Sequence, residues 1–352
     1  MTDLSLDPVH ASCPVPHAET ERVLLGHGSG GQLMAELLED VITPPLGGHD
    51  VLEDAAIIGV GDANLAFSTD SFVVTPRFFP GGDIGSLAVY GTVNDLAMRG
   101  ARPLALSLSY ILEEGLPLDE LRRITASAAA AARAADVTIV TGDTKVVGRG
   151  ACDGIYITTT GIGVTEANAW PSAAGGQPGD WVLLSGPIGQ HGVAILSARE
   201  DLGFDTEIRS DSQPLHRLVE AMVAAGGGGV RTLRDPTRGG LASALNELAA
   251  ASGVGVELFE SDIPVPAQVA AACELLGLDP LHVANEGCLV AFVDPAVGPA
   301  VTAAMHSLAE GASARRIGTV THGPAGRVTA HTLVGSTRIV DMLVGEQLPR
   351  IC

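Results

Sequence analysis

The alternation of short apolar runs with helix-like stretches is the feature that most constrains the fold of this chain. Between residues 51 and 165 the apolar runs include AAIIGV, NLAFST, LALSLSYIL, VTIVTG and GIYITTTGIGV. The segments GSLAVYGTVNDLAMRG and LDELRRITASAAAAARAA between them carry the apolar spacing of helices. A similar alternation starts again at Gly179 with DWVLLSGPIG. The sequence therefore predicts α/β or layered α+β architecture in both halves of the chain.

A stretch rich in Gly, Pro and Ala separates the two halves. Residues 166–178 (EANAWPSAAGGQP) break both periodicities, so we expect a linker there. The length of 352 residues also fits two domains better than one. The expected parts are a mobile tail at 1–21, a Gly-rich loop and helix at 22–50, a first domain at 51–165, the linker, a second domain at 179–310 and a C-terminal segment at 311–352 with a mobile end.

Charge and cysteine content disfavour several functional classes. The 20 basic and 41 acidic residues give a net charge of −21, and such a surface repels nucleic-acid phosphates and anionic lipid. No apolar run reaches the roughly 18 residues of a membrane span, and the N-terminal residues show no secretory signal pattern. The five cysteines are scattered without a CxxC pair, which disfavours a disulfide framework or zinc ribbon. We therefore expect a cytoplasmic enzyme that binds neither nucleic acid nor membrane.

The Gly-rich segment GHGSGG at residues 26–31 formally matches the dinucleotide-binding pattern GxGxxG. It lies between the short apolar run RVLL and a helix-like segment, and Asp50 or Glu53 follows about twenty residues later. Because bare backbone N–H groups in such a loop bind the phosphates of any nucleotide, three interpretations stay open. The loop binds NAD, contacts the phosphates of another nucleotide, or is only a structural turn.

Lys145 is the only lysine among the 20 basic residues. It follows directly after Gly142, Asp143 and Thr144. A lysine can exchange a proton where an arginine effectively cannot, so this position is a candidate for chemistry. The alternative is codon bias with the chance survival of one surface lysine.

Five aspartates stand where an apolar run ends and a turn begins. They are Asp54, Asp70, Asp95, Asp143 and Asp235. Carboxylates without Cys or His partners are hard oxygen ligands suited to Mg²⁺, which in turn pairs with phosphate. One such aspartate is usually a turn residue or a helix cap. Five at the ends of strands, where the sites of α/β folds assemble, indicate a magnesium–nucleotide site.

Two further residues carry potential chemistry. Glu286 precedes the apolar run LVAFV and, taken alone, is as well explained as a solvated turn residue. Cys352 is the last residue, and a terminal cysteine is the least constrained thiol that a chain can present. Pro349 disfavours helix, so we expect an extended tail. A frayed end with an accidental cysteine is the alternative.

These motifs together resemble one family. The run FSTDSFVVTPRFFPGGDIGSLAVYGTVNDLAMRGARPLALSLS, with GDTKVV, DPTRGGL, NEG and a terminal PRIC, is similar to the HypE carbamoyl dehydratases of [NiFe]-hydrogenase maturation. That family lies within the aminoimidazole-ribonucleotide-synthetase-like superfamily of ATP enzymes. The resemblance covers residues 22–352, and GDTKVV with a terminal PRIC is its most specific part. It implies a two-domain α/β fold whose first domain forms a β-barrel across a homodimer.

The resemblance also implies ATP and Mg²⁺ as cofactors. The implied metal ligands are Asp54, Asp70, Asp95, Asp143 and Asp235. The implied nucleotide contacts are Gly28, Ser29, Gly30, Gly31, Asp70, Asn94, Gly142, Asp143 and Thr144. In the implied catalytic set, Cys352 carries the substrate group and Lys145 and Glu286 handle protons.

The implied reaction is the ATP-dependent dehydration of an S-carbamoyl group on Cys352 to a thiocyanate, which supplies the cyanide ligands of the hydrogenase iron. The implied partners are a second copy of the chain, a HypF-type carbamoyltransferase and a HypC–HypD-type iron scaffold. A selenophosphate synthetase, a thiamine-phosphate-kinase-like enzyme, a dinucleotide-binding oxidoreductase and a non-catalytic scaffold with an acidic binding face remain as alternatives.

Overall fold

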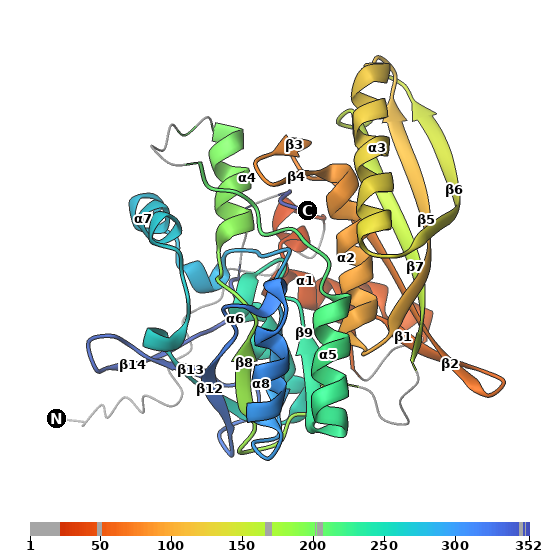
Figure 1. The fold of residues 1–352 in the computed structure, drawn as a ribbon. Coiled ribbons are helices and arrows are strands. Elements are labelled where there is room, and N and C mark those ends of the chain that lie inside the picture. The colour runs from red at the N-terminus through yellow and green to blue at the C-terminus, as the bar shows by residue number, and fades with distance from the viewer. Residues whose placement is uncertain are drawn as a thin grey trace.

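The strands of the chain form two main sheets, and helices pack against both (Figure 1). The computed structural model describes residues 22–47, 51–165, 171–200, 202, 207–344, 348 and 350–352. The tail expected at 1–21 and residues 166–170 of the expected linker lie outside the described residues. Two short strands, β3 (Phe78–Phe79) and β4 (Gly82–Asp83), form a separate hairpin.

The first sheet has five strands in the order β1-β2-β7-β5-β6. They are β1 (Ala56–Val60), β2 (Ala63–Phe72), β5 (Arg102–Glu113), β6 (Thr138–Val147) and β7 (Ile155–Thr165). Only β5 and β6 pair in parallel, and α3 (Leu118–Ala134) is the crossover between them. With α2 (Ile84–Met98), α3 covers one face of the sheet (Figure 1).

Helix α2 positions part of the site. Asp83 caps its first turn by accepting hydrogen bonds from the N–H groups of Gly85 and Ser86. The helix packs against β2 and β7 on one side and against α5 and β9 of the second half on the other. Because it lies between two layers, its apolar residues surround the axis, and a polar residue such as Asp95 lies at the junction of the two halves.

The opposite face of the first sheet, which we call the open face, carries large exposed apolar side chains. They are Ile58, Val60, Phe67, Ile111 and Ile162. Phe67 and Ile162 are direct cross-strand partners on this face. No described helix covers the open face (Figure 1). Exposed apolar side chains gathered in this way are typical of a protein–protein contact surface.

The second sheet has seven strands in the order β14-β13-β10-β12-β8-β11-β9. They are β8 (Trp181–Leu184), β9 (Val230–Arg234), β10 (Gly255–Phe259), β11 (Val290–Val293), β12 (Arg315–Thr321), β13 (Val328–His331) and β14 (Thr337–Ile339). The accompanying helices are α4 (Gln190–Glu200), α5 (His216–Gly226), α6 (Gly240–Ser252), α7 (Ala267–Leu276) and α8 (Gly298–His306). Every residue of β11 is buried, so the turn before this strand lies deep in the molecule.

No strand precedes the Gly-rich loop in residues 22–47 of the structure. The apolar run RVLL leads into a 3₁₀ turn at Leu25–Gly28, and the helix that follows, α1 (Gln32–Leu37), is short. A dinucleotide-binding unit needs a strand before this loop, so the structure disfavours NAD binding here. Among the described helices, none is both long and apolar enough to cross a membrane.

Candidate active site

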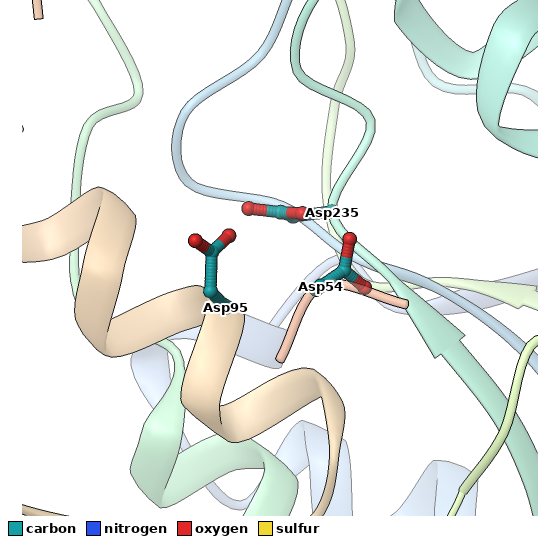
Figure 2. Close-up of side chains that lie close together, drawn as sticks. All are labelled: Asp54, Asp95 and Asp235. Carbon is teal, nitrogen blue, oxygen red and sulfur yellow. The ribbon is translucent and has the colours of Figure 1, made fainter. Parts of the chain in front are cut away.

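Three of the five predicted aspartates meet between the two halves of the chain (Figure 2). Asp54 precedes β1, Asp95 lies on α2, and Asp235 follows directly after β9. One carboxylate oxygen of each lies within 4.8 Å of those of the other two. Three separate elements therefore deliver carboxylates to one point.

Burial and mutual repulsion shift the titration of this cluster. Burial, with the charges of Asp235, Asp70 and Asp54, raises the pKa of Asp95 well above its ordinary value. Burial and the charge of Asp54 raise the pKa of Asp235 to about 7. Ser68 Oγ donates to Asp95 Oδ2 at 2.7 Å. Buried or half-buried carboxylates that repel one another in this way fit the charge and the oxygen preference of Mg²⁺.

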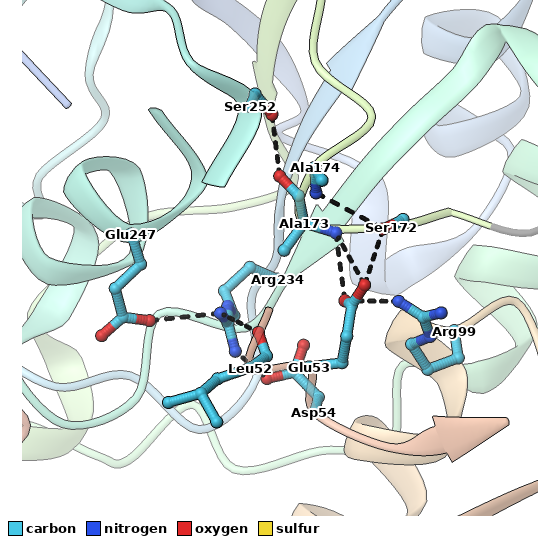
Figure 3. Close-up of polar contacts among 10 residues, drawn as sticks. All are labelled: Leu52, Glu53, Asp54, Arg99, Ser172, Ala173, Ala174, Arg234, Glu247 and Ser252. Carbon is cyan, nitrogen blue, oxygen red and sulfur yellow. Dashed lines mark hydrogen bonds and ion pairs between the residues drawn. The ribbon is translucent and has the colours of Figure 1, made fainter. Parts of the chain in front are cut away.

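A network of ion pairs holds the segment before β1 in place (Figure 3). Arg234 pairs with Asp54 at 2.5 Å and with Glu247 at 3.2 Å. The neighbouring Glu53 pairs with Arg99 and accepts hydrogen bonds from Ser172 Oγ and from the N–H of Ala173. Glu53 is thus fully engaged within the protein, which removes it as the ribose ligand of a dinucleotide site.

Asp70 and Arg238 extend the cluster toward the Gly-rich loop. Burial raises the pKa of Asp70, and the charge of Arg238 opposes that shift. The pKa of Arg238 is raised most by Cys352, in the ionised form of its thiol, and also by the charges of Asp70 and Glu286. Gly30 has a φ of +74°, and a Cβ atom there would lie 2.6 Å from the carbonyl oxygen of Arg238. The Gly-rich loop is therefore held directly against the residue that carries positive charge into the site.

Glu286 lies in the turn before β11 and is only 3% exposed. Its Oε1 atom has no hydrogen-bond partner among the described residues. Burial, followed by the charges of Asp235 and Asp211, raises its pKa well above the ordinary value. Asp211 accepts hydrogen bonds from the N–H groups of Glu286 and Gly287, both at 3.1 Å, and so fixes the turn. A carboxylate with a raised pKa is a stronger base once ionised, which suits proton abstraction.

The chain ends inside this site. The N–H of Val73 donates to the carbonyl oxygen of Cys352 at 2.9 Å. Burial raises the pKa of the Cys352 thiol to about 12, Arg238 opposes the shift, and Glu286 adds to it. The expected mobile end is thus docked in this structure, with its thiol among the buried charges of the site.

The structure does not bring the β6 residues to the cluster within one chain. Gly142 is aligned through β5 and β7 with Asp70, so it stands three strands away from it. Asp143 and Lys145 form an ion pair of 2.6 Å and are mostly exposed. Lys145 is the cross-strand partner of Ile111, one of the open-face residues, and Asp143 is two residues before it on β6, so both are on the open face. The expectation that Asp143 joins the other aspartates fails for a single chain, because β6 is the far edge strand.

Asn94 has a structural role that the sequence did not indicate. Its Nδ2 donates to the carbonyl of Gln213 at 3.1 Å, and its Oδ1 accepts from the N–H of Leu215 at 2.8 Å. Both ends of the amide are thus used to join α2 to the second half. The expected contact of Asn94 with the nucleotide stays a prediction beside this structural role.

Two site residues escaped the sequence analysis. Arg238 lies in the motif DPTRGGL, three residues after Asp235, and its position in that motif could have identified it. Asp211 has no recognisable motif around it, and only the folded chain shows that it supports the turn at Glu286.

Comparison with known proteins places this site in a class. Residues 52–165 match the N-terminal domain of AIR synthase related proteins, and residues 177–331 match the C-terminal domain. The fold and site thus define an AIR-synthase-related protein with a buried acidic centre between its domains.

The particular family follows from closer relatives. The carbamoyl dehydratase HypE of Cupriavidus necator is 55% identical over 334 residues, which cover 94% of this chain and 95% of that protein. The crystal structure of a HypE–HypF complex has a TM-score of 0.82 and 46% identity and covers 89% of this chain and 100% of the other. The structure of the hydrogenase maturation protein HypE in complex with ATP has a TM-score of 0.80 and 47% identity, with coverages of 94% and 100%. The chain belongs to the HypE family of carbamoyl dehydratases, which are enzymes of hydrogenase maturation.

Proposed function

We propose that this chain uses ATP to dehydrate a carbamoyl group carried on Cys352 to a thiocyanate, as the source of a cyanide ligand for hydrogenase iron. The observation that carries this proposal is the docked C-terminus: the carbonyl of Cys352 is bound by Val73, and its thiol lies close enough to Arg238, Glu286 and Asp70 for their charges to act on its pKa. The relative solved with bound ATP supports the choice of nucleotide.

The reaction removes one water molecule from –S–C(=O)–NH₂ to give –S–C≡N. Oxygen is a poor leaving group, so the γ-phosphoryl group of ATP is first transferred to the carbamoyl oxygen. Loss of that oxygen as phosphate, together with the protons of the nitrogen, forms the nitrile. Asp54, Asp95 and Asp235 would hold Mg²⁺, which supplies positive charge against the phosphates when bound.

The chain's own residues divide the remaining work. Glu286 takes a proton from the carbamoyl nitrogen. Its Oε1 atom is buried without a hydrogen-bond partner among the described residues, and Arg238 and Asp70 act on the pKa of both Glu286 and the Cys352 thiol. Arg238 provides a fixed positive charge beside Cys352, where negative charge develops on the substrate oxygen. Asp70 stays within the charge network that holds Arg238 in place.

A second copy of the chain completes the proposal. The apolar open face needs a partner, and a homodimer that packs two open faces would cover it. Lys145 and Asp143 lie on this same face, so we assign Lys145 to the active site of the partner rather than of its own chain. A HypF-type carbamoyltransferase loads Cys352, and a HypC–HypD-type iron scaffold receives the product. A carrier thiol must stay reduced, which places the reaction in the cytoplasm.

Mass spectrometry of the C-terminal peptide tests the carrier role. Carbamoylated protein supplied with Mg–ATP should lose the mass of one water at Cys352. Cys352→Ala should still bind ATP but should form no nitrile. If the Cys352→Ala variant continues to yield a cyanide-bearing product, the carrier assignment is wrong.

A further inference from the structure

The last residues of the chain are recognised through their backbone. The N–H of Val73 donates to the carbonyl of Cys352 at 2.9 Å, and the N–H of Thr75 donates to the carbonyl of Arg350 at 3.2 Å. Arg350 Nε donates in turn to the carbonyl of Val73 at 3.0 Å. This two-residue alternation resembles an added strand, and it leaves the carbonyl of Ile351 pointing to the other side.

His191 binds that remaining carbonyl. Its Nε2 lies 2.6 Å from the carbonyl oxygen of Ile351, and its Nδ1 lies 2.8 Å from Ser210 Oγ. The ring is 0% exposed and packs edge-on against Phe79, with the ring centroids 5.6 Å apart. The N–H of Ser212 donates to Ser210 Oγ at 3.1 Å.

These contacts permit one arrangement of hydrogens on a neutral ring. A carbonyl can only accept, so Nε2 carries the proton and donates to Ile351. Burial lowers the pKa of His191 to about 4, which keeps the ring neutral and leaves Nδ1 as an acceptor. The hydroxyl of Ser210 therefore donates to Nδ1, while its oxygen accepts from Ser212. Each donor in the series has a matching acceptor.

We propose that His191, oriented by Ser210, is a positioning residue that fixes the register of the docked C-terminus and thereby the depth at which the Cys352 sulfur enters the site. The proposal rests on the carrier role of Cys352 given above. Removing the hydrogen bond at Ile351 would leave the sulfur free to shift relative to Glu286 and Arg238.

The arrangement suits a carrier that must dock in several chemical states. The thiol, the thiocarbamate and the thiocyanate differ only beyond the sulfur atom. The docking hydrogen bonds lie on the backbone or on Arg350, and the side chains of Leu348 and Ile351 are buried in the core. Arg199 adds hydrogen bonds to the carbonyls of Thr75 and Arg350, and Arg350 pairs with Asp153 at 2.8 Å. Recognition of the backbone therefore holds the register constant while the cargo changes.

Four variants test the proposal. His191→Phe keeps the ring volume but loses the donor, His191→Gln keeps an N–H donor, and Ser210→Ala removes the group that orients the ring. His322→Phe, at an exposed position, is the matched control. For each full-length variant, two rates are measured: alkylation of Cys352 by iodoacetamide, and single-turnover dehydration of the carbamoylated protein with Mg–ATP.

We expect His191→Phe to expose the thiol to faster alkylation and to slow dehydration by about 10²-fold, since a misplacement of about 1 Å costs roughly that much. The KM for ATP should stay unchanged, so the loss appears in kcat. His191→Gln should recover most of the rate, Ser210→Ala should fall between the two, and His322→Phe should match the wild type.

Two outcomes overturn the proposal. One is an unchanged alkylation rate in His191→Phe, and the other is an altered alkylation rate with an unchanged dehydration rate. If the His191→Phe protein does not fold, Ser210→Ala decides instead: an unchanged alkylation rate, or an altered alkylation rate with unchanged dehydration, overturns the proposal, and His191→Gln remains the variant expected to stay near the wild type. If wild-type protein forms no nitrile on Cys352, the proposed function fails, whereas the alkylation rates still test the docking of the terminus.

Discussion

At the scale of single residues, ionising the acidic cluster lowers the stability of the folded protein, and a bound cation would offset this loss. Asp235 titrates at about 7 in the folded protein instead of its ordinary 3.8. The folded, metal-free protein therefore binds more protons than the unfolded chain between these pH values. By linkage, the stability that protonated Asp235 contributes is present at low pH and is lost as the pH rises through about 7. A divalent cation binds the ionised form and reverses that trend.

This linkage gives a prediction for Asp235→Asn. In wild-type protein, Mg²⁺ with ATP should raise the melting temperature more at about pH 8 than at about pH 5, because ionised carboxylates bind the metal. Asp235→Asn should make the metal-free protein less sensitive to pH and should weaken Mg²⁺ binding by about 10-fold or more. Thermal unfolding across this pH range, with and without Mg²⁺, measures both effects.

The exposed Asp62, in the turn between β1 and β2, provides the control for this experiment. Asp62→Asn should change neither the pH dependence nor the effect of Mg²⁺. A pH profile of Asp235→Asn that coincides with that of the wild type would contradict the assigned burial and repulsion in the cluster.

Burial also shifts the titration of the Cys352 thiol, and here the shift affects its reactivity. Burial raises the pKa of Cys352 to about 12, so the docked sulfur is protonated near neutral pH. The thiolate is the nucleophilic form of cysteine. If Cys352 carries the carbamoyl group as proposed, we expect it to be loaded with the C-terminus away from its docked position.

At the scale of elements, the turn before β11 determines where Glu286 lies. A Cβ atom on Gly287 would lie 1.8 Å from the carbonyl oxygen of Asp211, so the two segments touch without room for a side chain. The N–H of Gly287 also donates to the Asp211 carboxylate at 3.1 Å. A glycine at this position is thus required by the close approach of two backbones.

We predict that Gly287→Ala displaces the turn and Glu286 with it. Overpacking of this kind costs about 1–3 kcal/mol of unfolding free energy, and loss of an aligned general base lowers the rate by about 10²-fold or more. Thermal unfolding and single-turnover dehydration measure the two effects. Gly228→Ala is the control, because a Cβ atom there meets nothing within 4 Å. Equal dehydration rates in Gly287→Ala and the control would contradict the inference that this turn positions Glu286 for proton abstraction.

The elements also show how far the sequence alone predicts this molecule. Helix α3 and the long strands β2, β5 and β7 follow from local periodicity, which is written into consecutive residues, whereas the apolar residues of α2 surround its axis and carry no such signal. Asp54, Asp95 and Asp235 could be recognised because each ends an apolar run or lies in a short motif.

Contacts between segments far apart in the chain could not be predicted from the sequence in this way. Nothing near Val73 or His191 in the sequence indicates that the C-terminus docks beside them, because the contacts join residues far apart in the chain and use mainly backbone atoms. Within one chain Asp143 lies away from the other aspartates, because strand order, which the local sequence does not encode, puts β6 at the far edge of the sheet, and its role at the metal stays a prediction.

At the scale of the whole molecule, one chain shows two incomplete features. The open face exposes Phe67 and Ile162 as direct neighbours, and Lys145 extends from the same face without reaching the site of its own chain. A twofold pairing of open faces resolves both, because a symmetric contact covers the apolar residues and brings each lysine to the other subunit. The two subunits would then share each active site.

Complementation between two inactive variants tests this sharing. Lys145→Ala and Cys352→Ala should each be inactive alone, but their co-expressed mixture should recover about a quarter of wild-type dehydration, since half of the dimers are mixed and each has one intact site. Ile162→Asp on both chains should yield monomers by light scattering and abolish the recovery, whereas Val334→Asp, at an 89% exposed position on the hairpin of β13 and β14, should do neither. A mixture as inactive as its parents would instead assign Lys145 to its own chain, and an active Ile162→Asp monomer would show that one chain suffices.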